Sequence, residues 1–239
     1  LNFQEIDRLP VIASYPYPDY EKFRPFPHGE VFDNPEKMLF NQFVQTFDQS
    51  PFLSLQIGDD LPFSIRADFG CVLVASMFGA TIEQKDNNPP WVRNADSQVS
   101  YDEILNTSLK DFQRGIIPRV VDRYKMFVDI LKEYPALESA TNITLPDLQG
   151  PFDNLELLRG SDIFVEMYSQ KQAFLKAMEM MTNAQIGLVR YLSKFISEKV
   201  GGISHQHGFA IKGGILIRND TSIMISPQMY RQMISLYDE

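Results

Sequence analysis

Two predicted strands of this 239-residue chain end in acidic and amide side chains that could bind a substrate or transfer a proton. The strands cover residues 142–147 and 213–220. The polar side chains at their C-terminal ends are Asp147, Gln149, Asn219 and Asp220. In a parallel barrel such positions face the mouth, where active sites are built. We therefore expect substrate contacts here, with a turn in which Asp147 bonds its own backbone as the alternative.

Two histidines, His205 and His207, lie two residues apart before a pair of glycines. On an extended segment residues at this spacing share a face, so both rings could reach one metal ion or one substrate carboxylate. Zinc requires three or four protein ligands in most sites, and two histidines do not complete such a set. The residues therefore indicate either substrate contacts or a polar loop, and we expect no metal site in this chain.

An aromatic and proline-rich stretch covers residues 15–27 near the N-terminus. Its aromatic residues are Tyr15, Tyr17, Tyr20, Phe23 and Phe26. Flat aromatic faces suit a planar macrocycle or another extended apolar ligand, which makes Tyr15 a candidate substrate contact. The same side chains could instead cover one end of the fold.

Composition excludes several classes of protein. The net charge is -9, and no basic stripe suggests a nucleic-acid partner. No apolar stretch has the length of a membrane span, and no signal peptide is visible, so we expect a cytoplasmic, soluble protein. Cys71 is the single cysteine, which precludes an internal disulfide, and its apolar surroundings in sequence favour a small buried side chain.

The order of predicted elements alternates between strands and helices. Strands are expected at residues 7–15 and 52–58 besides the two named above. Helices are expected at 34–50 and 170–200, one or two helices within 101–131, and a last helix after Ser226. Such alternation favours a parallel sheet with helical crossovers. The length fits one domain over residues 1–239, close to the roughly 250 residues of a (β/α)₈ barrel.

Four stretches together resemble the uroporphyrinogen decarboxylase superfamily. Residues 145–152 read Leu-Pro-Asp-Leu-Gln-Gly-Pro-Phe, and residues 213–220 read Gly-Gly-Ile-Leu-Ile-Arg-Asn-Asp before a Ser-Pro helix start. Residues 66–79 carry an acidic turn and a Met-Phe-Gly helix end, and residues 7–11 fit the family's first strand. The resemblance implies an α/β fold of the (β/α)₈ TIM-barrel type, here without its last strands. It also implies catalytic roles for Asp68 and Asp220.

The chain departs from the family's decarboxylases at two places. Those enzymes carry two arginines after the first strand, which bind substrate carboxylates, whereas residues 12–20 contain none. They also carry a tyrosine shortly after the Gly-x-Pro-Phe turn, and residues 153–158 contain none. These departures favour the other branch of the family, the methyltransferases.

Three functions follow from this resemblance. The favoured one is a methyltransferase that acts on a corrinoid or a small methylated substrate, with zinc held by ligands beyond Glu239. The second is decarboxylation of a tetrapyrrole or another carboxylate, which needs no cofactor. The third is a non-catalytic, barrel-derived binding module, in which an open sheet edge could support a homodimer.

Overall fold

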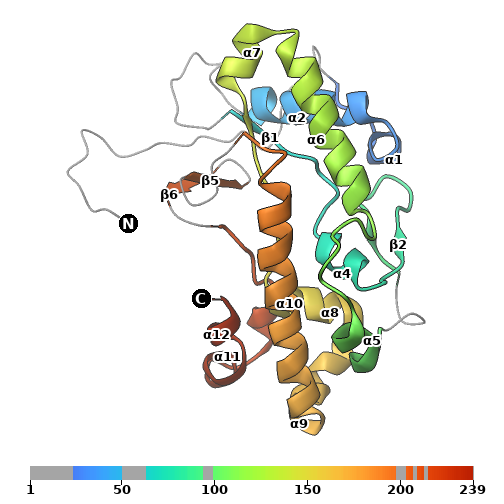
Figure 1. Cartoon of the computed structure of the whole chain (residues 1–239), viewed down its shortest axis with the longest axis vertical. Helices are drawn as coiled ribbons and strands as arrows, with labels where there is room; N and C mark the ends of the chain where they lie inside the picture. Colours follow the sequence, from blue (N-terminus) through green and yellow to red (C-terminus); the bar gives the residue numbers. More distant parts are fainter. Residues whose placement is uncertain are drawn as a thin grey trace, which may run out of the picture. The chain divides into compact units, whose positions relative to one another are not determined.

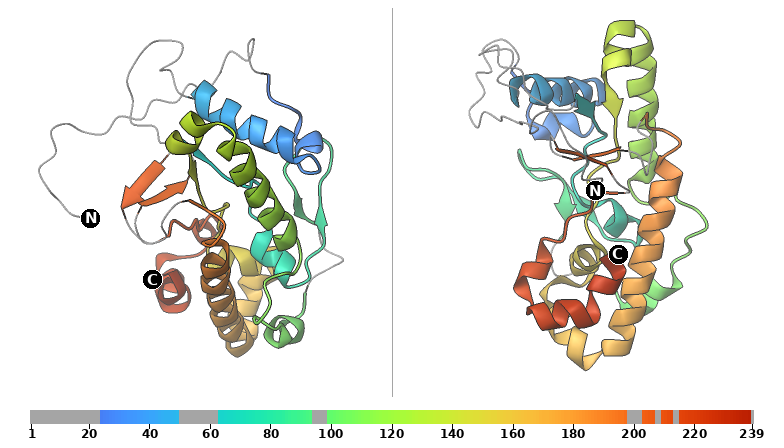
Figure 2. Two further views of the ribbon diagram at one scale, coloured as in Figure 1. Left: turned by 45° about the horizontal axis from the view of Figure 1, so that its top comes forward. Right: turned by 90° about the vertical axis from the view of Figure 1, so that its left-hand side faces the viewer.

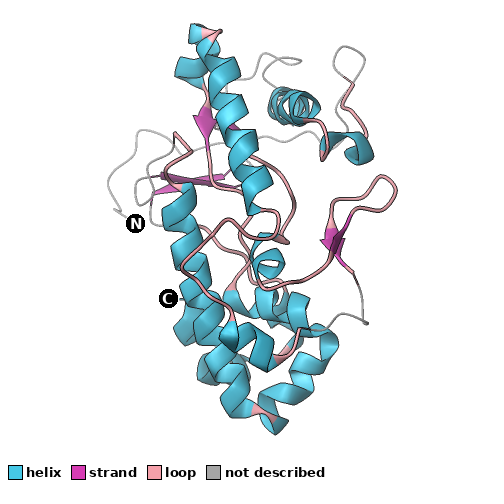
Figure 3. Ribbon diagram, turned by 45° about the vertical axis from the view of Figure 1, so that its right-hand side comes forward, coloured by secondary structure: helices cyan, strands magenta, loops and turns pink. Residues whose placement is uncertain are grey.

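The computed structural model describes residues 24–49, 63–93, 99–197, 203–206, 209–212 and 215–238. The chain divides into two compact units, each assembled from three segments. Unit 1 comprises Leu1–Asp68, Asp122–Pro146 and Phe195–Leu216. Unit 2 comprises Phe69–Val121, Asp147–Lys194 and Ile217–Glu239. Most of the secondary structure in the described residues is helical, and the strands are short (Figure 3).

Unit 1 contains most of the strand pairing. Its helices are α1 (His28–Val31), α2 (Pro35–Gln49), α7 (Pro135–Ala140) and the part of α6 (Ile117–Lys132) from Asp122 onward. Its strands are β1 (Ser64–Ile65), β4 (Asn142–Ile143), β5 (Ile203–Gln206) and β6 (Phe209–Lys212). β1 and β4 pair in parallel, and β5 and β6 form an antiparallel pair. The parallel pair agrees with the predicted strand–helix alternation.

Local sequence explains how α2 begins and how α6 packs. The side chain of Asn34 accepts a hydrogen bond from the backbone of Lys37 at 2.8 Å, and Pro35 occupies the first helical position. On α6, the buried hydroxyl of Tyr124 donates to the carbonyl of Thr144 at 2.8 Å. This bond ties the helix to the segment that follows β4.

Unit 2 is built around α10 (Lys171–Leu192), which packs against α5 (Tyr101–Asn106), α8 (Pro151–Arg159) and α9 (Ile163–Ser169) (Figure 1). Its other elements are α4 (Leu73–Met77), β2 (Ile82–Glu83), β3 (Trp91–Val92), η1 (Gly160–Asp162), η2 (Thr221–Met224), α11 (Pro227–Met233) and α12 (Ser235–Asp238). The last two helices contact each other, and α12 also contacts α10 (Figure 2).

The buried face of α10 follows helical periodicity, which the sequence predicted. Its buried members are Phe174, Ala177, Met178, Met181, Ala184, Gln185, Leu188, Val189 and Leu192. The ring of Phe152 on α8 meets that of Phe174 edge to face, with centroids 6.2 Å apart. Apolar burial along this seam holds unit 2 together.

Three predicted elements differ in extent from those observed. The predicted helix 170–200 ends at Leu192, and the chain after it pairs with β4. The backbone amide of Ser197 donates to the carbonyl of Ile143 at 3.1 Å, and the amide of Ile143 donates to the hydroxyl of Ser197 at 2.7 Å. The predicted strand 142–147 is reduced to the two residues of β4, and Pro146 has no N–H with which a ladder could resume.

Within the described part of the predicted strand 213–220, residues 215–220, the pairing is a single parallel bridge between Arg218 and Gln149. Beyond that bridge, the backbone amides of Asp220 and Thr221 donate to the side chain of Asp153 instead of to a neighbouring strand. The described residues thus contain one parallel strand pair and one parallel bridge, so a complete (β/α)₈ barrel stays a prediction. The single domain over residues 1–239 also stays a prediction.

Other predictions lie outside the described residues, namely the strands at 7–15 and 52–58 and the side chains of Tyr15 and His207. The capped last helix is confirmed: the hydroxyl of Ser226 accepts from the backbone of Met229 at the start of α11. Among the described residues, no helix combines the length and apolarity that a membrane crossing requires.

Two glycines with left-handed backbone differ in the space around them, which yields a stability prediction. A Cβ on Gly115 (φ 55°) would lie 2.4 Å from the hydroxyl oxygen of Ser76, whereas one on Gly70 (φ 64°) would meet nothing nearer than 3.5 Å. Both alanine variants carry a backbone strain of about 1–2 kcal/mol. We expect Gly115→Ala to lose a further 1–3 kcal/mol or so in free energy of unfolding, measured in urea, because Ser76 is buried and cannot withdraw. Equal losses for the two variants would contradict this packing.

Candidate functional site

The polar residues predicted at two strand ends meet at one junction in unit 2. Gln149 and Arg218 form a parallel bridge: the amide of Arg218 donates to the carbonyl of Leu148 at 3.2 Å, and the amide of Gly150 donates to the carbonyl of Arg218 at 2.5 Å. We call this the bridge junction, comprising residues 147–153 and 218–221. It brings Asp147 and Gln149 beside the segment that carries Asn219 and Asp220.

An ion pair lies at the centre of the bridge junction. The guanidinium of Arg218 contacts the carboxylate of Asp147, which is only 5% exposed. With its amide oriented to satisfy both neighbours, Gln149 accepts from Arg218 at 3.2 Å and donates to a carboxylate oxygen of Asp153 at 2.5 Å. Buried charges need such partners, because removal from water otherwise makes them costly. Asp147 thus pairs with an arginine from a distant segment, a contact that neither a substrate contact nor a turn with its own backbone had predicted.

Asp153 connects the two segments of the bridge junction. Gly150 caps α8 and Pro151 begins it, which places Asp153 in the first helical turn. Its two carboxylate oxygens accept from the backbone amides of Asp220 and Thr221, each at 2.8 Å, and so cap η2. Burial raises the pKa of Asp153 above its ordinary value, although these hydrogen bonds act in the opposite direction.

The side chain of Asn219 is directed toward α12 and toward Gly150. Its amide nitrogen donates to Asp238 at 2.6 Å, and Tyr230 donates to the same carboxylate oxygen at 2.8 Å. A Cβ on Gly150 would lie 1.8 Å from the amide oxygen of Asn219, so only glycine fits there. Asn219 therefore anchors the junction, and its predicted contact with substrate stays a prediction. Asp220, in contrast, is exposed.

Cys71 lies in the electric field of this junction, although the sequence suggested an ordinary buried side chain. Burial raises the pKa of its thiol from 9.0 to about 11, and the negative charge of Asp147 is the next largest cause. Arg218 acts in the opposite direction and is the weaker of the two. The thiol therefore stays protonated at neutral pH.

Other predicted site residues are described within unit 1. Asp68 forms an ion pair with Arg66, whose nitrogen lies 3.3 Å from its carboxylate. The backbone of Arg66 also donates to Gln42 of α2 at 3.0 Å. His205 lies in β5, opposite Ala210 of β6. The catalytic role of Asp68 and the contacts of His205, His207 and Tyr15 with substrate stay predictions.

Sequence reasoning missed three members of the site: Arg218, Asp153 and Cys71. Arg218 carried a usable signal, because it directly precedes Asn219 and Asp220. Asp153 had a weaker one, as an acidic residue in the first turn after a Gly-Pro helix start. Nothing in the sequence around Cys71 indicates its charged neighbours.

The described residues include no group of three or more His, Cys, Asp or Glu side chains that could hold a metal ion. Zinc therefore does not fit the side chains placed at the bridge junction.

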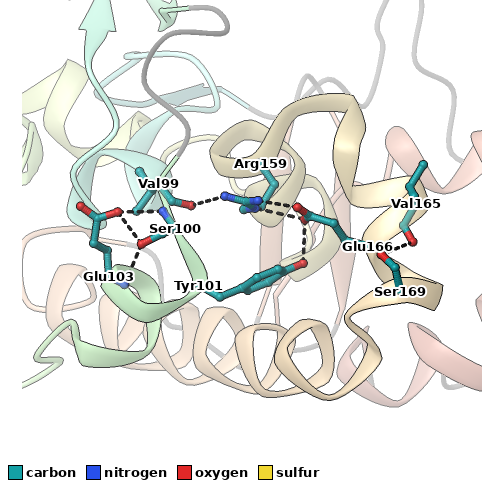
Figure 4. A network of polar contacts seen from close by, with 8 residues as sticks. All are labelled: Val99, Ser100, Tyr101, Glu103, Arg159, Val165, Glu166 and Ser169. Atoms are coloured by element: carbon teal, nitrogen blue, oxygen red, sulfur yellow. Dashed lines mark hydrogen bonds and ion pairs between the residues drawn. The ribbon is translucent and has the colours of Figure 1, made fainter.

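A second polar network in unit 2 connects α5, α8 and α9 (Figure 4). Arg159 contacts both carboxylate oxygens of Glu166 and donates to the carbonyl of Val99 at 2.9 Å. Tyr101 donates to Glu166 at 3.0 Å, and Arg159 lies 4.9 Å from the centre of the Tyr101 ring. Burial, and after it this hydrogen bond, raise the pKa of the Tyr101 hydroxyl. The charges are mutually satisfied, and the network fastens three helices together.

No protein-family model and no curated protein matches the chain. A solved structure of a methyltransferase from Methanosarcina mazei matches with a TM-score of 0.65 at 15% identity. The match covers 98% of this chain and 61% of that chain. The chain shares its fold with that methyltransferase. It spans about three fifths of the methyltransferase's length, and at this identity the likeness concerns the fold alone.

The charges around Cys71 predict opposite effects of two substitutions on thiol reactivity. At pH 8 a thiol of pKa about 11 is ionised in about one molecule per thousand, so alkylation by iodoacetamide should be slow. Asp147→Asn removes a charge that raises this pKa and should speed alkylation. Arg218→Gln removes a charge that lowers it and should slow alkylation. Mass spectrometry measures the alkylated fraction of Cys71, which is the single cysteine of the chain. Changes of the same sign in both variants would refute the assignment.

The double acceptor role of Asp153 predicts a stability loss. Asp153→Asn turns one acceptor into a donor facing a backbone amide, which should cost about 1–3 kcal/mol in free energy of unfolding. The exposed Asp102→Asn is a matched control that should change stability by less than about 0.5 kcal/mol. Urea unfolding of both variants measures the difference, and a neutral Asp153→Asn would count against the capping role.

Proposed function

We propose that the chain is a methyltransferase-like enzyme of the uroporphyrinogen decarboxylase superfamily, acting on a corrinoid-bound or small methylated substrate at the bridge junction. Its fold likeness to a methyltransferase over 98% of its length supports this proposal. The (β/α)₈ barrel belongs to the same proposal. The parallel β1–β4 pair and the parallel Gln149–Arg218 bridge are the pairings expected between neighbouring barrel strands.

The charge of the bridge junction is the observation that carries the proposal. Three carboxylates, from Asp147, Asp153 and Asp220, stand against the guanidinium of Arg218. That guanidinium is already engaged by Asp147 and Gln149. Such a site repels a polycarboxylate and accepts a neutral or cationic methyl donor. It therefore favours methyl transfer over the decarboxylation of a tetrapyrrole.

The chain's residues divide the work in this mechanism. The Asp147–Arg218 pair and the Asp153 cap hold the two segments in one geometry before the substrate arrives, which lowers the cost of binding. Asp220 is exposed, so its carboxylate is available to take the proton of an acceptor thiol. The sulfur then forms a bond to the methyl carbon. The bond between that carbon and the donor breaks, and its electron pair stays with the donor. Because the described side chains do not fit zinc, no step is assigned to a metal.

The test is a methyl-transfer assay. Purified protein is incubated anaerobically with methylcobalamin and 2-mercaptoethanol, and in parallel with methylamine or methanol as donor. We expect protein-dependent loss of the methylcobalamin absorbance and formation of a methyl thioether, detected by mass spectrometry. Asp220→Asn should slow the transfer at least about tenfold, and Asp102→Asn is the control that should not.

The alternatives have distinct outcomes in the same preparation. Release of carbon dioxide from uroporphyrinogen, without methyl transfer, would replace the proposal with a decarboxylase. Absence of turnover with every donor and with uroporphyrinogen would replace it with a non-catalytic binding module.

A further inference from the structure

A buried amide interrupts the apolar face of α10. Gln185 is 5% exposed, and the neighbouring buried positions on this face are apolar, among them Met181 and Leu188. Burying an amide is unfavourable unless its polar atoms are hydrogen-bonded. The amide oxygen of Gln185 has no hydrogen-bond partner among the described residues. The polar contact of Gln185 is therefore made by its amide nitrogen.

The nitrogen of Gln185 reaches the bridge junction. It donates to the backbone carbonyl of Gln149 at 2.8 Å. Asn154, on α8, donates to the same carbonyl at 2.9 Å and to the carbonyl of Gly150 at 3.0 Å. A carbonyl oxygen accepts two hydrogen bonds, so both sites of the Gln149 carbonyl are occupied by side chains of two different helices.

Gln149 is the residue through which these bonds act on the site. Its main chain forms the bridge with Arg218, and its side chain lies between Arg218 and Asp153. From this geometry we infer that Gln185 is a positioning residue, which uses α10 as a rigid support to fix the Gln149 peptide and thereby the charged groups of the bridge junction. Asn154 supports the same peptide from α8. The inference deepens the proposed function, since it concerns the same site.

A positioning role and a merely structural role predict different results for Gln185→Met. Methionine has a similar volume and removes both the N–H bond and the unpaired oxygen, so the free energy of unfolding should change little. The geometry of the junction should nevertheless loosen. Cys71 reports this, because its reactivity depends on burial and on Asp147 and Arg218.

The experiment measures the rate of Cys71 alkylation by iodoacetamide from pH 7 to pH 11 in the full chain. For Gln185→Met we expect the rate at pH 8 to rise at least about threefold. The matched control is Thr182→Val on the same helix. Its hydroxyl donates only to Met178, one turn earlier in α10, so its loss should leave the profile unchanged.

Two results would overturn the inference. The first is a Gln185→Met profile identical to that of the unsubstituted chain. The second is an equal displacement in Thr182→Val, which would assign the effect to a general loosening of α10. Alkylation needs no methyl donor, so either result is independent of the methyl-transfer assay and of the proposed function.

Discussion

The ion pair between Arg218 and Asp147 is the contact on which the architecture of the candidate site depends. It joins two segments that are 71 residues apart and that share only one backbone bridge. Asp147 is nearly inaccessible to water, so its buried charge needs compensation, which the guanidinium of Arg218 supplies. One bridge gives little cohesion on its own. The side-chain charges therefore do what a longer ladder of backbone bonds does in a full strand.

Asp153 shows why that ladder is short. The amide of Asp220 would donate the next bond of the parallel pairing, but it donates to the carboxylate of Asp153 instead, as does the amide of Thr221. The same carboxylate accepts from Gln149. A single buried acid thus ends the strand, starts η2 and completes the polar junction. The short strand and the site are consequences of the same residue.

The sequence predicted those features that depend on neighbouring residues. Asn34 and Ser226 mark helix starts because a cap acts within one turn, and the buried face of α10 follows from its periodicity. The end of α10 was mispredicted, because the pairing of Ser197 with Ile143 joins positions far apart in the chain. Arg218 and Cys71 were missed as site residues for the same reason. Their roles come from charges that only the folded chain brings together.

The state of Cys71 bears on the chemistry that the junction can perform. Burial, and after it the negative charge of Asp147, hold the Cys71 thiol in its protonated form, because both disfavour a thiolate. The same field favours a departing or incoming group that is neutral or positive. With a pKa of about 11, the Cys71 thiol is not suited to act as a nucleophile near neutral pH. Burial and the carboxylate of Asp147 thus raise the pKa of the Cys71 thiol together, and the guanidinium of Arg218 opposes them.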